Sequence, residues 1–161
     1  MLMAVVWVRW DSIYWQVWKS QPRLPVNAAE QEWVSFSGAD MRLVEFGGAT
    51  GIVGSNNKPI ALPDGVKAWK VVLEFKAPDQ EAIGGCGITL EDSQNRLYGR
   101  PDELSNVRGQ SFVSCTKPTE ESSSQYRTTI LFITPADAKP VAVQIRWITK
   151  FPRYVRLNIR G

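Results

Sequence analysis

The feature that most constrains the fold of this chain is an alternation of apolar and polar side chains in short segments. The alternation is clearest in VKAWKVVLEFKAP, residues 66–78, where Val71, Leu73 and Phe75 are interleaved with lysine and glutamate. Successive side chains of a β-strand point to opposite faces of its sheet, so a period of two predicts a strand with one buried face. We therefore expect a strand here that contributes three apolar side chains to a core.

Similar short segments recur between residues 33 and 161, separated by Gly, Pro, Asn and Asp residues that favour turns. The expected strands lie within 33–46, 66–76, 88–98, 112–114, 126–135, 139–149 and 153–160. An α/β fold would need helices of about 10–15 residues between the strands, and this part of the chain has little helical periodicity. The pattern predicts an all-β domain, a sandwich or a barrel, over residues 33–161.

Two stretches of this domain resemble the telokin-like, immunoglobulin-type domains of bacterial exported proteins and lipoproteins. The first is VKAWKVVLEFKAP followed by ITLEDSQNRLYG, and the second is RTTILFITPADAKPVAVQIRW. The resemblance implies an immunoglobulin-like antiparallel β-sandwich, commonly placed after a lipoprotein or membrane anchor, with no shared catalytic residues. The chain departs from that family by lacking a lipobox cysteine near its start, and by its long connection over residues 100–125 and its extra basic strand at the end.

The amino-terminal segment is unusually rich in tryptophan. Four of the seven tryptophans of the chain fall in its first eighteen residues, together with a tyrosine. These aromatic residues are Trp7, Trp10, Tyr14, Trp15 and Trp18. As a helix, most of them recur at steps of three or four and form one aromatic stripe. We expect a short helix over residues 1–19.

Two roles for this helix stay open. The aromatic side chains favour the boundary between lipid and water, so the helix is predicted to lie close to a membrane. The apolar run of residues 1–8 is too short to span a bilayer, which needs about twenty residues, so most of a span would lie upstream of Met1. Alternatively, the helix is amphipathic and packs on its own domain or on a partner protein. Residues 20–32 contain Pro22 and Pro25 and are predicted to be a linker.

Cys86 and Cys115 are the only cysteines, and neither belongs to a CxxC pair. Both lie beside loops, which favours one disulfide in an exported protein over two buried free thiols. Such a bond would close a loop of about thirty residues and contribute roughly 3–4 kcal/mol.

Little in the sequence indicates catalysis. The chain has no histidine, which removes the commonest general base and the commonest zinc ligand. Adjacent acidic residues occur at Glu91 and Asp92, Asp102 and Glu103, and Glu120 and Glu121, but neighbours in a strand point to opposite faces. The glycine-rich loop Gly47–Gly54 lacks the lysine and the following helix of a nucleotide-binding loop. We expect no enzymatic activity, no cofactor and no metal.

The carboxyl-terminal residues 138–160 are basic and contain no Asp or Glu. Arg146 and Arg156 alternate with apolar residues, which predicts that they lie on the solvated faces of two final strands. Contact with an anionic surface, such as lipid headgroups or phosphate, is the alternative. The formal net charge of +3 is too small to indicate a nucleic-acid-binding protein.

These observations predict a non-catalytic accessory module, anchored at the cell membrane with its domain outside the cytoplasm. It would bind or stabilise another envelope or membrane protein, through the amino-terminal segment or by adding a strand at a sandwich edge. The alternative is a carbohydrate-binding or glycan-hydrolysing domain with exposed aromatic residues as a sugar platform. For that role the candidates are Trp69, whose exposure the pattern leaves open, and Trp147, which we expect to be buried.

Overall fold

The computed structural model describes residues 15–101, 104, 107–108, 114–119 and 123–160. Three of the predicted aromatic contact residues, Trp7, Trp10 and Tyr14, lie outside the described residues.

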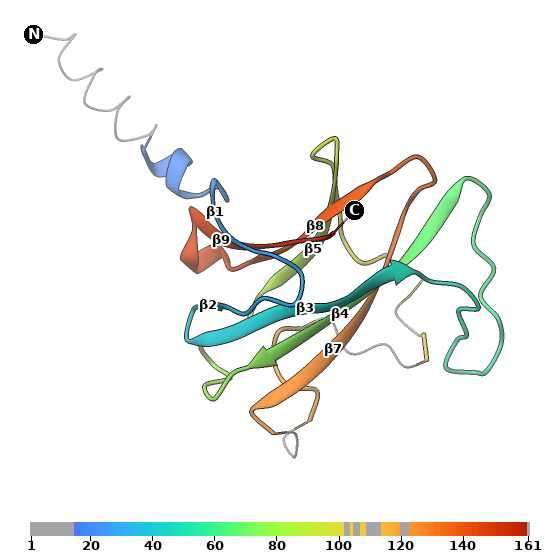
Figure 1. Ribbon diagram of the computed structural model, residues 1–161, viewed down its shortest axis with the longest axis horizontal. Helices are drawn as coiled ribbons and strands as arrows, with labels where there is room; N and C mark the ends of the chain where they lie inside the picture. Colours follow the sequence, from blue (N-terminus) through green and yellow to red (C-terminus); the bar gives the residue numbers. More distant parts are fainter. Residues whose placement is uncertain (1–14, 102–103, 105–106, 109–113, 120–122, 161) are drawn as a thin grey trace, which may run out of the picture.

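The chain folds into two packed β-sheets (Figure 1), so the predicted β-sandwich is confirmed. The five-stranded sheet has the order β1 (Leu24–Ala28), β9 (Arg153–Asn158), β8 (Pro140–Arg146), β5 (Gly87–Asp92) and β6 (Leu97–Tyr98). The four-stranded sheet has the order β2 (Val34–Phe36), β3 (Ala39–Gly48), β4 (Val66–Lys76) and β7 (Gln125–Pro135). A short 3-10 helix, η2 (Ile148–Lys150), connects β8 to β9.

The core lies between the two sheets and is built from the alternating residues that the sequence marks. Val71, Leu73 and Phe75 of β4 are fully buried, as predicted. They face apolar residues of the five-stranded sheet, including Leu90 and Ile145. Burying an aliphatic or aromatic side chain of this size contributes about 1.5–3 kcal/mol, so this layer is the main stabilising element.

A second, smaller apolar cluster covers the outer face of the four-stranded sheet. Ala68 and Leu131 of two neighbouring strands contact Ile52, Leu104 and Val107 there. The glycine-rich loop Gly47–Gly54 is therefore held against the sheet through a buried isoleucine. Isolated β-bridges from Val53 and Gly54 fix the same segment further.

The predicted linker over residues 20–32 is wrong in part, because β1 lies within it. β1 pairs with β9 in parallel, with Leu24 opposite Arg153, so the sandwich begins at Leu24 and is not wholly antiparallel. Pro25 has no backbone N–H, but a proline is tolerated in an edge strand, where one side needs no ladder partner. The two prolines that indicated a linker therefore mark the entry to an edge strand.

Candidate functional site

Residues 15–19 form a helical turn at one end of the sandwich. The Trp15 side chain is 51% exposed and packs edge-on against Trp18, with 5.8 Å between the ring centroids. The helix ends at Ser20, whose backbone N–H donates to the carbonyls of Gln16 and Val17. Two of the predicted aromatic residues thus lie side by side on a short helix next to the sandwich.

The chain leaving this helix is tied to the connection between β8 and β9. The backbone N–H groups of Arg23 and Leu24 both donate to the carbonyl of Pro152, each at 2.9 Å. Figure 1 shows the helical residues and η2 together at the same end of the molecule. We name this region, residues 15–24 and 147–153, the helical end.

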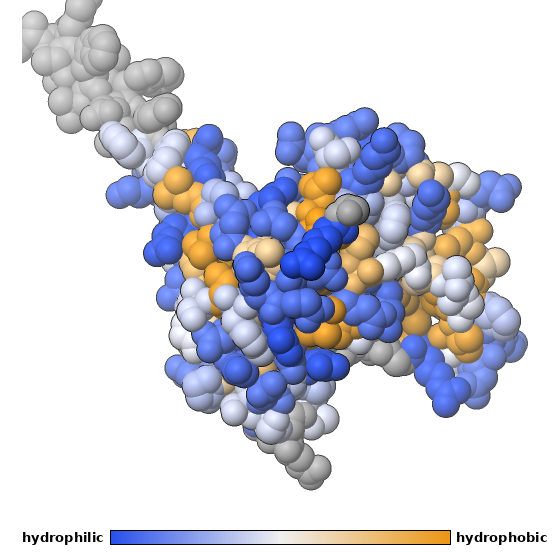
Figure 2. All heavy atoms as spheres, in the orientation of Figure 1, coloured by the Kyte–Doolittle hydropathy of each residue, from blue (hydrophilic) through white to orange (hydrophobic). Residues whose placement is uncertain are grey.

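Exposed apolar side chains gather at the helical end. Five large hydrophobic residues are exposed in the described part of the chain, and four of them lie here. These four are Trp15, Val17, Leu24 and Ile148, the last of which is 82% exposed at the start of η2. Figure 2 shows hydrophobic side chains interleaved with hydrophilic ones where the helical residues meet the sandwich. The fifth exposed residue, Leu97, lies on the edge strand β6.

The charges of the helical end are all positive. Lys19, Arg23, Lys150 and Arg153 lie within it, and residues 12–29 and 138–160 contain no acidic residue. Basic side chains therefore lie among the exposed apolar ones at the helical end.

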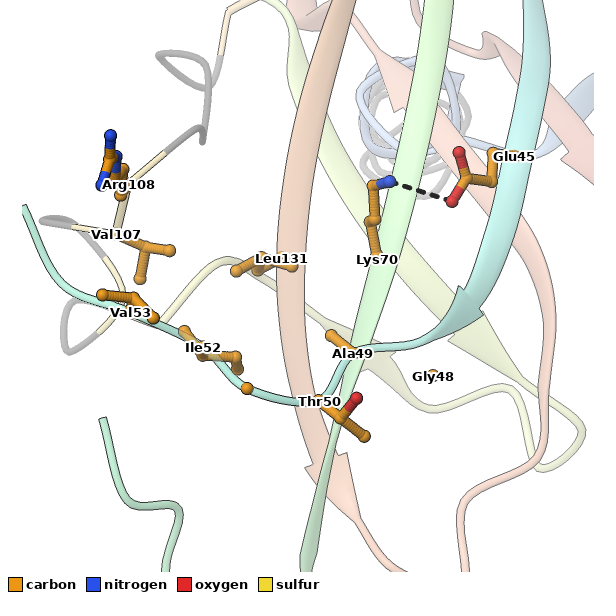
Figure 3. A pocket seen from close by; sticks show the side chains of 11 residues that line it. Glu45, Gly48, Ala49, Thr50, Ile52, Val53, Lys70, Val107, Arg108 and Leu131 are labelled. Carbon is orange, nitrogen blue, oxygen red and sulfur yellow. Dashed lines mark hydrogen bonds and ion pairs between the residues drawn. The ribbon is translucent and has the colours of Figure 1, made fainter. Parts of the chain in front are cut away.

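A groove lies beside the glycine-rich loop, where β3 ends and β4 begins. Its volume is about 530 Å³, and its floor is formed by apolar residues that include Ala49, Ile52 and Leu131. Figure 3 shows Lys70 reaching across the rim to Glu45, with 2.9 Å between Lys70 Nζ and Glu45 Oε1. A third charged residue, Arg108, also lines the groove, and its guanidinium donates to Asn57 Oδ1 at 2.8 Å.

The two described members of the acidic pairs each have their own basic partners. Glu91 accepts hydrogen bonds from Arg156 at 2.9 and 3.1 Å and from Gln144 at 2.7 Å. Burial alone would raise the pKa of Glu91, but these hydrogen bonds outweigh it and the pKa is lowered. The side chain is therefore held ionised within the outer face of the five-stranded sheet.

Asp92 organises a turn. Its Oδ1 accepts the backbone N–H groups of Gln94 and Arg96, both at 2.9 Å, and its Oδ2 accepts from the Arg96 guanidinium at 2.7 Å and the Tyr98 hydroxyl at 3.0 Å. Burial pushes the pKa of Asp92 upward, but the donors from Arg96 and Gln94 hold it at about 2. A carboxylate so fully engaged is a structural element of the turn. The other two pairs, Asp102 with Glu103 and Glu120 with Glu121, lie outside the described residues.

The tryptophans considered as a sugar platform are engaged within the domain. The ring of Trp69 stacks on Phe46 with centroids 5.2 Å apart, and its N–H donates to Thr134 Oγ1 at 2.9 Å. Trp147 is 2% exposed, as expected, and donates to the Ile83 carbonyl at 3.0 Å. Both indole N–H groups are thus satisfied by the protein itself.

The expected disulfide is present between Cys86 and Cys115. It fastens the segment 114–119 to the turn before β5, and Cys115 is fully buried in the main core. The described residues contain no group of three or more Cys, Asp or Glu side chains placed to hold a metal ion.

The sequence did not predict that η2 contributes to the helical end. Ile148 was expected within a strand, but the chain turns out of β8 at Trp147. The signal that could have found it is the run Trp147 to Pro152, where two consecutive apolar residues and a proline interrupt the alternation.

Comparison with known proteins does not place the chain in a family. No family model and no curated protein matches this sequence. A solved structure of an uncharacterized beta-sandwich protein from Clostridium difficile 630 is similar in shape, with a TM-score of 0.49 and 10% sequence identity, over 88% of this chain and 98% of that one. Within the described part of the chain, no helix combines the length and the apolar character needed to cross a membrane.

Proposed function

We propose that this chain is a non-catalytic module that is held at a membrane by its helical end. It displays its sandwich outside the cytoplasm, where it binds another envelope or membrane protein. The observation that carries the proposal is the gathering of exposed apolar side chains and basic ones, in segments without acidic residues, at the end where the amino-terminal helix joins the sandwich. A free soluble domain seldom leaves such side chains together in water.

The disulfide supports a location outside the cytoplasm. Disulfides persist in oxidising compartments and are rare where glutathione and thioredoxin keep thiols reduced. Cys86 and Cys115 are bonded to each other and no other cysteine exists in the chain.

The strand order supports an immunoglobulin-like arrangement of the sandwich. If β4, β5, β7, β8 and β9 are taken as strands B, C, E, F and G, then B pairs with E in one sheet and C, F and G follow one another in the other. This is the division of strands that defines immunoglobulin-type sandwiches. β1 is then an added strand, parallel to G.

A protein partner would fit the edge formed by β7. This strand has eleven residues and ends the four-stranded sheet in the part of the chain that the structure describes. Adding a strand of a partner to such an edge satisfies backbone groups on both sides. The edge at β1 suits this less well, because Pro25 interrupts its donors.

Membrane attachment is tested with the full chain and vesicles of phosphatidylcholine containing phosphatidylglycerol. We expect the chain to co-sediment with these vesicles and the double variant Trp15→Ser/Trp18→Ser to bind at least about tenfold more weakly, because two large apolar surfaces are lost. Deletion of residues 1–20, which leaves β1 intact, should weaken binding at least as much as the double variant does.

Leu97→Ser is the matched control, since this exposed side chain lies away from the helical end. It should leave vesicle binding unchanged. Equal losses in the control and the tryptophan variant, or binding as tight as that of the whole chain after residues 1–20 are deleted, would contradict the proposal.

A further inference from the structure

A small cavity lies beside η2, on the outer side of the five-stranded sheet. Its volume is about 300 Å³. It is bounded by the turn before β5 with Thr89 on one side, by Ile148 and Phe151 on the other, and by Arg146. The cavity therefore opens at the helical end, next to the most exposed apolar residue of the described chain.

Arg146 is the charged group of this cavity. It lies opposite Gly87 in the register between β8 and β5, where the absence of a side chain on the glycine leaves room. Its Nη2 donates to Thr89 Oγ1 at 3.0 Å, while its Nε is buried and has no hydrogen-bond partner among the described residues. An unpaired buried donor on a cation is costly, and the positive charge of this guanidinium favours an anion in the cavity that Arg146 lines.

The nearby carboxylate does not neutralise Arg146. Glu91 is hydrogen-bonded by Arg156 and Gln144, as described above, while the Arg146 Nη2 donates to Thr89 instead. Burial lowers the pKa of Arg146 from its ordinary value, opposed by the charge of Glu91 and by Tyr154. An arginine nevertheless stays protonated in proteins, so one positive charge remains without a hydrogen-bonded anion.

The rim of the cavity indicates the kind of anion. Ile148 and Phe151 line it, and Lys150 is exposed between them. A free inorganic anion gains nothing from apolar neighbours, whereas a lipid carries its phosphate directly beside acyl chains. A partly buried arginine and an exposed isoleucine on the same cavity match a lipid at the level of its headgroup.

We propose that this cavity binds the phosphate group of an anionic phospholipid, with Arg146 as its ligand and Ile148 entering the interface. The lipid assignment rests on the proposed membrane attachment, while the phosphate contact is a local property of the cavity. The site would give the sandwich a second contact with the bilayer and so fix its orientation.

The test uses full-length protein and dioctanoyl phosphatidylglycerol, a short-chain lipid kept below its micelle concentration, with inorganic phosphate as the second probe. We expect the lipid to shift the NMR resonance of the Arg146 Nε–H in the wild-type protein. Arg146→Gln should weaken lipid binding by about tenfold or more, the loss expected for a charged hydrogen bond. The wild-type resonance gives a result even where the variant folds poorly.

Arg127→Gln is the matched control, because it removes the same charge from an exposed side chain on the other sheet. It should leave lipid binding unchanged. Ile148→Ser should weaken binding to the lipid and leave any weak binding of inorganic phosphate as it is.

The outcomes separate this proposal from the proposed function. If Arg146→Gln binds the lipid as tightly as wild type and the Nε–H resonance does not move, the cavity site is overturned, even where the tryptophan variants lose vesicle binding. If inorganic phosphate binds as tightly as the lipid and Ile148→Ser changes nothing, the lipid assignment is overturned. If the lipid binds through Arg146 but vesicles do not retain the full chain, the phosphate site stands and the membrane attachment fails.

Discussion

Removing the disulfide is the perturbation whose effect on stability follows most directly from the structure. The bond joins residues 29 positions apart in sequence. In the chain-entropy model, a cross-link closing a loop of this length lowers the entropy of the unfolded state and so raises its free energy by about 3.6 kcal/mol at 25 °C. The double variant Cys86→Ala/Cys115→Ala should therefore be less stable by about 3–4 kcal/mol.

The folded state should survive this loss, because other contacts hold the same segment in place. The Tyr126 hydroxyl donates to the Cys115 carbonyl at 2.5 Å, and the Lys117 N–H donates to Gln80 Oε1 at 2.6 Å. The effect of the cross-link should thus come mainly from the unfolded chain, which becomes free to expand.

Urea unfolding followed by tryptophan fluorescence measures the change. With a denaturant slope of about 2 kcal/mol per molar, the midpoint should fall by roughly 1.8 M. Wild-type protein reduced with a phosphine is the control, since it loses the cross-link without changing the side-chain volume of Cys115. A loss below about 1 kcal/mol in both samples would refute the loop-entropy reasoning, and a loss confined to the alanine variant would assign the effect to the void at Cys115.

Three further predictions concern the acidic groups and the second apolar cluster. Asp92 has a pKa of about 2 in the folded protein, below the ordinary 3.8, so its ionised form stabilises the fold above pH 4 and this contribution is lost as the pH falls toward 2. In acid titrations followed by circular dichroism, Asp92→Asn should make the stability of the protein less dependent on pH between 4 and 2. An unchanged pH dependence would contradict the assignment. Glu91→Gln should cost about 3 kcal/mol in urea unfolding, because it leaves the Arg156 guanidinium without its carboxylate, and the double variant Glu91→Gln/Arg156→Met should recover part of that loss. Leu131→Ala should cost about 2–3 kcal/mol by opening the cluster under the glycine-rich loop, and a cost near zero would mean that this cluster does not pack as described.

The strands and their buried faces could be predicted wherever neighbouring residues show a clear alternation of apolar and polar side chains. The alternation in residues 66–76 predicted both the strand and its buried face, and Val71, Leu73 and Phe75 are buried. The burial of Trp147 followed from its aliphatic neighbours. Arg146 and Arg156 lie on the outer faces of the two final strands, as predicted, but both are partly buried against polar partners rather than solvated.

The features that sequence reasoning missed depend on distant pairing. β1 has no clear alternation and contains a proline, and its partner strand begins at Arg153, at the other end of the chain. The pairing of Glu91 with Arg156 joins residues separated by 65 positions. Part of the candidate site could be predicted from the sequence, because its tryptophans are clustered there. The contributions of Arg146 and Ile148 could not, because they depend on how the chain turns at the end of β8.

The sequence by itself therefore determined the strands with clear alternation, such as β4, and their apolar faces, that two cysteines were available to cross-link the domain, and that aromatic residues gather at the amino terminus. These properties come from local periodicity and residue chemistry, which neighbouring positions are enough to express. Tertiary structure alone decided that β1 joins β9 in parallel, that Arg156 pairs with Glu91, and that the chain after the amino-terminal helix is tied to the connection between β8 and β9. Those outcomes depend on which strands become neighbours, and that choice is made by the summed burial and hydrogen bonding of the whole sandwich rather than by any one segment.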